Sequence, residues 1–165
     1  MMITLTGFMG SGKTTVGKVL ADFLGCPFLD LDDLVVKKAG KSIPEIFEQD
    51  GEPAFRELEA RLLRQTVAKY AESTAVLALG GGAILAPASA ALLRDKTVCI
   101  YLRATIDTLL ARLEGETAGR PLADASLAAR LAAREPLYEE TAHVTIDTDG
   151  LSPDEVADEI IISAL

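Results

Sequence analysis

Cysteine is scarce in this chain of 165 residues, and the two that occur, Cys26 and Cys99, are far apart. Two isolated cysteines are too few for a metal site with four cysteine ligands. Nothing else in the sequence indicates secretion, so we expect two buried, reduced thiols and no disulfide. Histidine is scarcer still. The only one, His143, stands at the start of an expected strand, and we interpret it as structural.

Long apolar runs are also missing. Apolar residues make up 49% of the chain, but charged residues interrupt them before any run reaches the ~20 residues that a membrane-spanning helix needs. The opening residues 1–6 lead directly into a glycine-rich motif, which leaves no room for a signal or transit peptide. We therefore expect a soluble, cytoplasmic protein that has no membrane partner.

An excess of positive charge is absent as well. The formal net charge is −9, and no stretch is rich in lysine and arginine, which argues against nucleic acid as a partner. The length suits one domain spanning residues 1–165, without internal repeats or low-complexity tracts. An acidic protein that binds anions must concentrate its cations locally. The informative cations are therefore individual residues, namely Lys13, Arg56, Arg112, Arg120 and Arg134.

Five short apolar runs are typical of buried strands, and the segments between them have the apolar spacing of helices. The expected strands are 2–6, 26–31, 75–79, 97–102 and 143–146. Helices are expected over 14–25, after the capping signals at 42–45 and 152–155, after Gly51, and over 105–113. This alternation predicts a three-layer α/β fold with a five-stranded parallel sheet. Residues 114–125 lose the periodicity, so we expect a long loop there.

Residues 7–14, Gly-Phe-Met-Gly-Ser-Gly-Lys-Thr, match the phosphate-loop pattern G-x-x-x-x-G-K-[ST] between an expected strand and an expected helix. In such a loop, backbone N–H groups and the helix N-terminus bind phosphate oxygens. Lys13 is expected to reach the β- and γ-phosphates of ATP, and the Thr14 hydroxyl to bind Mg²⁺. A glycine-rich turn with a surface lysine is the structural alternative. The expected ATP-binding residues of the loop are Gly10, Ser11, Gly12, Lys13, Thr14 and Thr15.

Further motifs narrow the choice of phosphate acceptor. They are Asp30-x-Asp32, Gly51-Glu52-x-x-Phe55-Arg56-x-x-Glu59, the glycines 80–82, Arg120-Pro121-Leu122, and Arg134-Glu135-Pro136-Leu137-Tyr138. In order and approximate spacing, this set resembles the shikimate kinase family over nearly the whole chain. The resemblance implies a P-loop fold with a mobile lid and ATP-dependent phosphorylation of the 3-hydroxyl of shikimate. The product would be 3-phosphoshikimate, in the pathway to aromatic amino acids.

The resemblance also implies a role for each motif. Arg56 and Arg134 would bind the substrate carboxylate, which suits the planar guanidinium group. Asp32 would accept a hydrogen bond from the attacking hydroxyl and act as its base. Asp30 would hold Mg²⁺ through a water, together with Thr14. Gly80, Gly81 and Gly82 would offer their backbone N–H groups to the substrate and, having no side chains, would let it approach the backbone closely.

The segment 114–125 is similar to the lid of that family. Arg120 would close over the γ-phosphate and stabilise the charge in transfer. Lys13, Asp32 and Arg120 are thus the expected catalytic residues, and Arg112 is expected to stack on adenine. Ala123 stands where the family often has a second leucine after Arg-Pro-Leu. We expect a monomer whose partners are ATP and shikimate.

Structural alternatives stay open for several of these residues. The two acidic residues after the second strand could simply cap the next helix. Arg56 could pair with Glu52 or Glu59, Arg134 with an acidic residue of its own helix, and Arg112 could be solvated. A gluconate-type sugar-acid kinase shares the fold, the size and the loop, but we do not expect it to carry the Phe55-Arg56 motif or the motif that begins at Arg134. A catalytically silent nucleotide-binding module is disfavoured, because all three expected catalytic residues are present.

Overall fold

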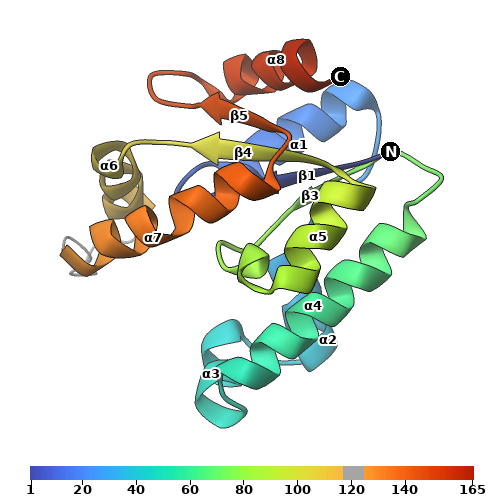
Figure 1. Cartoon of the computed structure of the whole chain (residues 1–165), viewed down its shortest axis with the longest axis vertical. Helices are drawn as coiled ribbons and strands as arrows, with labels where there is room; N and C mark the ends of the chain where they lie inside the picture. The colour runs from blue at the N-terminus through green and yellow to red at the C-terminus, as the bar shows by residue number, and fades with distance from the viewer. Residues whose placement is uncertain (117–124) are drawn as a thin grey trace.

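The computed structural model describes residues 1–116 and 125–165, and a five-stranded sheet lies at its centre (Figure 1). All neighbouring strands pair in parallel, in the order β2-β3-β1-β4-β5. The strands are β1 Met2–Thr6, β2 Phe28–Asp30, β3 Ala75–Ala78, β4 Val98–Arg103 and β5 Val144–Asp147. Every residue of the central strand β1 is buried, as expected for a parallel strand covered on both faces. The predicted sheet is confirmed.

Helices cover both faces of the sheet and give the predicted three layers (Figure 1). One face carries α1 Lys13–Leu24 and α8 Pro153–Ala164. The other face carries α4 Glu52–Lys69, α5 Pro87–Lys96 and α7 Ala125–Thr141. The remaining elements are α2 Leu31–Ala39, α3 Ile43–Gln49, the 3-10 turn η1 Ala83–Leu85 and α6 Ile106–Glu116. Among the residues that the structure describes, no helix is long and apolar enough to cross a bilayer.

Two apolar clusters, one on each face, fix the sheet between the helices. Ile3 and Leu5 of β1 belong to the first cluster, together with Val16 of α1. The second cluster contains Cys99 of β4 and joins β3 and β4 to α4, α5 and α7 through Leu77, Tyr101, Leu63, Leu93 and Leu131. Both cysteines are free, but Cys26 is only half-buried, so the prediction of two buried thiols is right for Cys99 alone.

The second strand is shorter than predicted at both ends. It begins only at Phe28, because the N–H of Cys26 bonds to the carbonyl of Ala21 and so completes the end of α1. It ends at Asp30, whose side chain accepts a hydrogen bond from the N–H of Asp32 at 2.9 Å and so caps α2. Local capping bonds, which an apolar pattern does not reveal, set both limits.

Both ends of the predicted loop 114–125 are helical in the structure. Helix α6 continues to Glu116, and α7 begins at Ala125. A glycine inside a helix costs only about 1 kcal/mol relative to alanine, so Gly115 does not end α6. The remaining residues 117–124, which include Arg120 and Ala123, lie outside the described residues.

The strand ends explain where the predicted site residues gather. Because all five strands are parallel, their carboxyl ends lie at one edge of the sheet. At this edge β1 leads into the phosphate loop 7–12, β2 ends at Asp30, and β3 leads into the glycines 80–82. Since β3 and β2 lie in succession beside β1, the three motifs are neighbours in space although they are far apart in the sequence.

His143 lies at the opposite edge, just before β5 begins. Its Nδ1 accepts a hydrogen bond from the N–H of Cys99 at 3.0 Å, and its Nε2 lies 3.0 Å from the carbonyl oxygen of Arg94. An accepting Nδ1 requires that the proton of the neutral ring sits on Nε2, which then donates to Arg94. The ring therefore joins β4 to the end of α5, in agreement with the structural interpretation.

We expect His143→Ala to lower the free energy of unfolding by about 1–3 kcal/mol, because the buried N–H of Cys99 loses its acceptor. His143→Asn carries an oxygen that can accept from the same N–H and should recover part of the loss. Urea denaturation of the three proteins measures this effect. ATP-dependent turnover should stay near wild-type, and a large loss of turnover at unchanged stability would contradict the structural role.

Candidate active site

The phosphate loop connects β1 to α1 with a backbone that only glycine adopts readily at three of its positions. Gly7, Gly10 and Gly12 have φ values of 150°, 80° and 93°, in a region that disfavours side chains. Lys13 lies under the loop, where its Nζ donates to the carbonyl oxygens of Gly7 at 2.7 Å and Phe8 at 2.9 Å. The lysine therefore holds the loop in a curve, with its ammonium group at the centre.

The charge of Lys13 is sensitive to its surroundings. Burial lowers the pKa of its ammonium group to about 8, although the carboxylates of Asp32 and Asp30 oppose this change. An anion that binds in the loop would stabilise the ammonium form and raise that pKa again. The lysine is therefore mostly charged at neutral pH, and a bound phosphate would keep it charged as the pH rises above 8.

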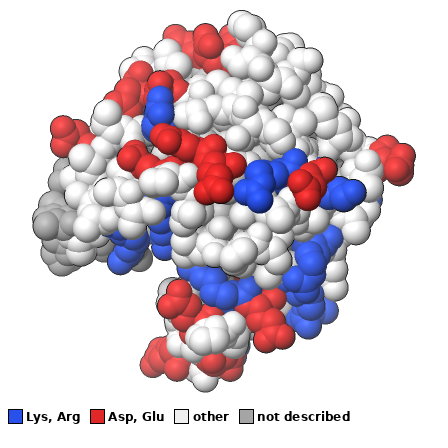
Figure 2. Space-filling model, in the orientation of Figure 1, with Lys and Arg blue, Asp and Glu red and all other residues white. Residues whose placement is uncertain are grey.

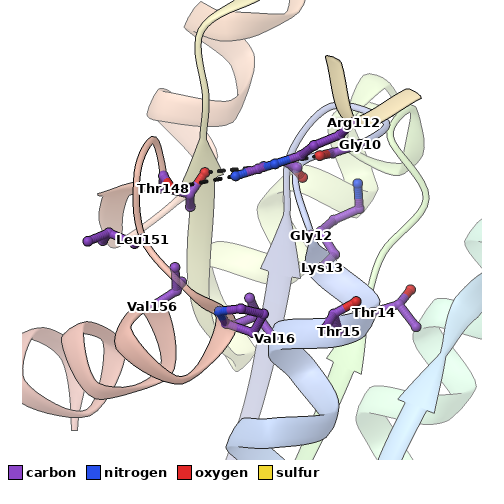
Figure 3. Close-up of a pocket in the computed structure, with 12 residues that line it drawn as sticks. Gly10, Gly12, Lys13, Thr14, Thr15, Val16, Arg112, Thr148, Leu151 and Val156 are labelled. Carbon is purple, nitrogen blue, oxygen red and sulfur yellow. Dashed lines mark hydrogen bonds between the residues drawn. The ribbon is translucent and has the colours of Figure 1, made fainter. Parts of the chain in front are cut away.

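A pocket of about 320 Å³ opens beside the loop (Figure 3). The predicted nucleotide-binding residues of the loop, from Gly10 to Thr15, line one side of it. The other side is formed by residues that we did not predict, which follow β5 or begin α8, namely Thr148, Leu151, Pro153 and Val156. The signal for them is weak in the sequence, because only the strand order shows that the turn after β5 faces the phosphate loop.

Arg112 of α6 lies at the edge of this pocket and joins its two sides. Its guanidinium donates to the carbonyl oxygen of Gly10 at 3.1 Å and lies 3.5 Å from both the hydroxyl and the carbonyl oxygen of Thr148 (Figure 3). The alternative of a solvated helix arginine is therefore wrong. The position is compatible with the predicted contact to adenine, which stays a prediction.

Two predicted oxygen ligands meet between α1 and α2. The Thr14 hydroxyl donates to Oδ2 of Asp30 at 3.0 Å, and Oδ1 of Asp30 accepts from the N–H of Asp32. The structural alternative, in which the acidic residue caps the next helix, is thus correct for Asp30. It does not exclude the metal role, because only one carboxylate oxygen is used by the cap.

Asp32 faces the glycines that follow β3. A Cβ on Gly80 would lie 2.9 Å from Oδ1 of Asp32 and 3.0 Å from Oε2 of Glu59, so a side chain at this position would displace these carboxylates. Burial raises the pKa of Asp32, and the nearby carboxylate of Asp30 raises it further, whereas Lys13 opposes the rise. A carboxyl group with a raised pKa beside a buried lysine is a candidate general base.

Arg56 of α4 reaches the same loop from the other side. A Cβ on Gly82 would lie 2.5 Å from both terminal nitrogens of its guanidinium. Arg56 also forms salt bridges with Glu59 at 2.9 Å and with Glu52 at 3.5 Å. The ion pairs of the structural alternative are therefore present. The arginine is nevertheless half-buried against the glycine loop and is not a free surface residue.

Glu59 is a member of the site to which the sequence analysis gave no role of its own. It is 3% exposed, and its Oε2 has no hydrogen-bond partner among the described residues. Burial raises the pKa of its carboxyl group, and the hydrogen bond from Arg56 opposes this rise. The sequence does contain a signal for the burial of Glu59. It stands four residues after Phe55 and four before Leu63, on the apolar face of α4.

Arg134 of α7 completes the group of charges. Its guanidinium lies 3.5 Å from the position of a Cβ on Gly81 and 5.8 Å from the ring centroid of Phe8. Within residues 1–116 and 125–165, Arg134 has no salt bridge, so the predicted alternative of an ion pair on its own helix is wrong. Figure 2 shows basic side chains on both sides of the hollow that separates the α2–α3 lobe from the rest of this face.

Comparison with known proteins gives this arrangement a family context. The family model described as shikimate kinase matches residues 9–164. A shikimate kinase from Enterococcus faecalis is 44% identical over 164 residues, which covers 96% of this chain and 95% of the relative. One from Geobacter sulfurreducens is 46% identical over 163 residues, which covers 96% and 87%.

Solved structures agree with these relatives. The shikimate kinase from Acinetobacter baumannii in complex with shikimate superposes with a TM-score of 0.85 at 36% identity, covering 97% of this chain and 90% of that one. The enzyme from Aquifex aeolicus has a TM-score of 0.85 at 32% identity, covering 99% and 95%. A sugar kinase from Janibacter has a TM-score of 0.66 at 19% identity, a likeness that shows the fold alone.

The lowered pKa of Lys13 predicts a pH-dependent affinity for ATP. Phosphate binds the ammonium form, so above the pKa of about 8 the free protein must take up a proton on binding. The dissociation constant should then rise about fivefold between pH 8 and pH 9, as calorimetry at constant excess Mg²⁺ would measure. Lys13→Arg keeps its charge throughout this range. Equal pH dependence in both proteins would contradict the prediction.

Proposed function

This chain belongs to the shikimate kinase family, and we propose that the residues gathered at the carboxyl edge of its sheet perform the reaction of that family. The reaction transfers the γ-phosphoryl group of ATP to the 3-hydroxyl of shikimate and gives 3-phosphoshikimate and ADP. One observation carries the assignment of residues. A phosphate loop with its lysine lies beside a second group of charges, Asp32, Arg56 and Arg134, which converge on one glycine loop.

ATP binds along the phosphate loop in this proposal. The loop N–H groups and the N-terminus of α1 bind the phosphates. Lys13 leaves the carbonyl oxygens of Gly7 and Phe8 and contacts the β- and γ-phosphates, where its charge offsets theirs. The pocket between Arg112 and α8 receives the nucleoside, and its apolar residues Leu151 and Val156 suit the face of a base.

Thr14 and Asp30 would hold Mg²⁺. Their oxygens already lie 3.0 Å apart on adjoining elements, and hydroxyl and carboxylate oxygens are the ligand types that this hard cation prefers. The cap that Asp30 provides for α2 fixes the direction of its carboxylate. When bound, Mg²⁺ supplies positive charge to the phosphate oxygens during transfer.

Shikimate binds on the other side of Asp32. Its carboxylate lies between the guanidinium groups of Arg56 and Arg134, which face the glycine loop from α4 and α7. Glu59 holds Arg56 in direction through the 2.9 Å salt bridge. The N–H groups of the glycines 80–82 are available to the ring hydroxyls, and Asp32 accepts the proton of the attacking hydroxyl. Its raised pKa makes it a better base for this step.

Arg120 stabilises the transferred charge in this proposal, as the Arg-Pro-Leu motif indicates. The residue lies outside the described part of the chain, so the assignment depends on the sequence motif. The described site residues gather at the carboxyl edge of one sheet, so a single domain supplies them in this proposal, and we take the monomer as the working unit. The need for ATP supports a cytoplasmic location.

A coupled assay for ADP release tests the function directly. We expect turnover with ATP and shikimate, and little ADP release with gluconate or without an acceptor. The phosphorylated product, identified by mass spectrometry, should carry one phosphate. Faster turnover with gluconate would favour the sugar-acid kinase, and binding of ATP without turnover of either acceptor would favour a silent nucleotide-binding module.

Asp32→Asn tests the acceptor site specifically. The amide keeps the size of the side chain but removes its charge and basicity, so phosphoryl transfer should fall by about 10²- to 10⁴-fold. ATP should still bind, because the phosphate loop is intact. Nucleotide affinity and shikimate phosphorylation are measured on the same preparation.

Asp33→Asn is the matched control, because Asp33 is the exposed neighbour on the same helix. It should leave both quantities near wild-type. Loss of nucleotide affinity together with turnover in Asp32→Asn would indicate a structural or metal-binding role for Asp32. If neither changes, the acceptor site lies elsewhere.

A further inference from the structure

Tyr138 is a fully buried residue of α7 whose hydroxyl reaches the glycine loop. It donates a hydrogen bond to the carbonyl oxygen of Gly81. The neighbouring carbonyls are satisfied locally, because Gly80 accepts from the N–H of Ala83 and Gly82 from the N–H of Leu85. Among the described residues, Tyr138 is the only donor to the Gly81 carbonyl. The middle peptide of the loop thus depends on one side chain from a distant helix.

Gly81 lies where the two halves of the site meet. The position of a Cβ on Gly81 is 3.5 Å from a guanidinium nitrogen of Arg134, 3.6 Å from the carbonyl oxygen of Gly7, and 3.7 Å from the hydroxyl of Tyr138. Arg134 and Tyr138 are four residues apart, so they lie on one face of α7. The hydrogen bond of Tyr138 therefore sets the distance between this face of α7, the glycine loop and the phosphate loop.

Tyr101 of β4 supports the ring of Tyr138 but makes no such bond. The two rings stack with centroids 5.0 Å apart and an interplanar angle of 28°. Both side chains are fully buried, yet the hydroxyl of Tyr101 has no hydrogen-bond partner among the described residues. The pair thus contains one hydroxyl that bonds to the glycine loop and one that makes no hydrogen bond in the described part of the chain.

The Tyr138 hydroxyl stays a donor at any working pH. Burial raises its pKa to about 12, although the charge of Arg134 opposes the rise. The net contribution of such a hydrogen bond to stability is small, but a buried carbonyl left without a donor is costly. The bond therefore holds the carbonyl in a fixed position. Three consecutive glycines have large backbone freedom, so the constraint acts where the chain would otherwise vary most.

We propose that Tyr138 is a positioning residue for the acceptor, which holds the Gly81 peptide and, through it, aligns the glycine loop with Arg134. The inference rests on the proposed function, since it assumes that shikimate occupies this loop. Tyr138 touches neither substrate in this account. Its loss should therefore weaken acceptor binding without changing the affinity for ATP, whose phosphate loop has its own internal bonds.

Tyr138→Phe and Tyr101→Phe form a matched pair, because each removes one buried hydroxyl from the same stacked rings. We expect Tyr138→Phe to raise the KM for shikimate about three- to tenfold, the worth of one buried hydrogen bond. The dissociation constant for ATP should stay within error, and kcat should change less than KM. Tyr101→Phe should leave all three constants near wild-type. Thermal unfolding confirms that both variants fold.

The outcomes separate the inference from the function on which it rests. Equal KM values in the two variants, with normal wild-type turnover, would overturn the positioning role alone. A lower melting temperature of Tyr138→Phe with an unchanged KM would also overturn it, since the hydroxyl would then be merely structural. Wild-type protein that does not phosphorylate shikimate would overturn the proposed function and the inference together.

Discussion

Space at the three glycines after β3 is the constraint on which the acceptor half of the site depends. Side chains from α2 and α4 approach these residues so closely that a Cβ on Gly80 or Gly82 would lie within 3 Å of Asp32 or Arg56. None of the three glycines has a positive φ, so the requirement is for room and not for an unusual backbone. A larger residue at either position would push Asp32 or Arg56 away from the loop. Charges that lie farther from a bound anion interact with it more weakly.

Positive side chains gather around this loop, which explains how an acidic protein can bind two anionic substrates. Arg56 is held by Glu59 and partly neutralised by it, whereas Arg134 forms no salt bridge among the described residues. Arg134 therefore supplies most of the uncompensated positive charge on the acceptor side. Lys13 has the same function on the nucleotide side, where burial lowers its pKa and a bound phosphate would raise that pKa again. The net charge of −9 thus says little about the potential inside the site.

Local patterns predicted the strands, the phosphate loop and the glycine loop, because each depends on residues that are close in the sequence. The limits of β2 were wrong, since capping bonds at Cys26 and Asp30 decide them. Thr148 was missed because only the strand order brings it beside the phosphate loop. The contact of Tyr138 with Gly81 joins residues 57 positions apart and depends on how α7 packs. Spacing predicts which face of a helix is buried, but it does not say which partner lies opposite.

Alignment of donor and acceptor also depends on the backbone of the sheet. β1 and β3 are adjacent strands, and the N–H of Leu79 donates to the carbonyl oxygen of Leu5 at 3.0 Å just before the two loops diverge. The phosphate loop and the glycine loop are therefore two continuations of one hydrogen-bonded ladder. In-line transfer tolerates little misplacement of the reacting atoms. A ladder buried between two apolar clusters provides such a reference, and the lobe that carries Asp32 and Arg56 packs beside it around a third cluster formed by Val35, Ile46 and Phe55.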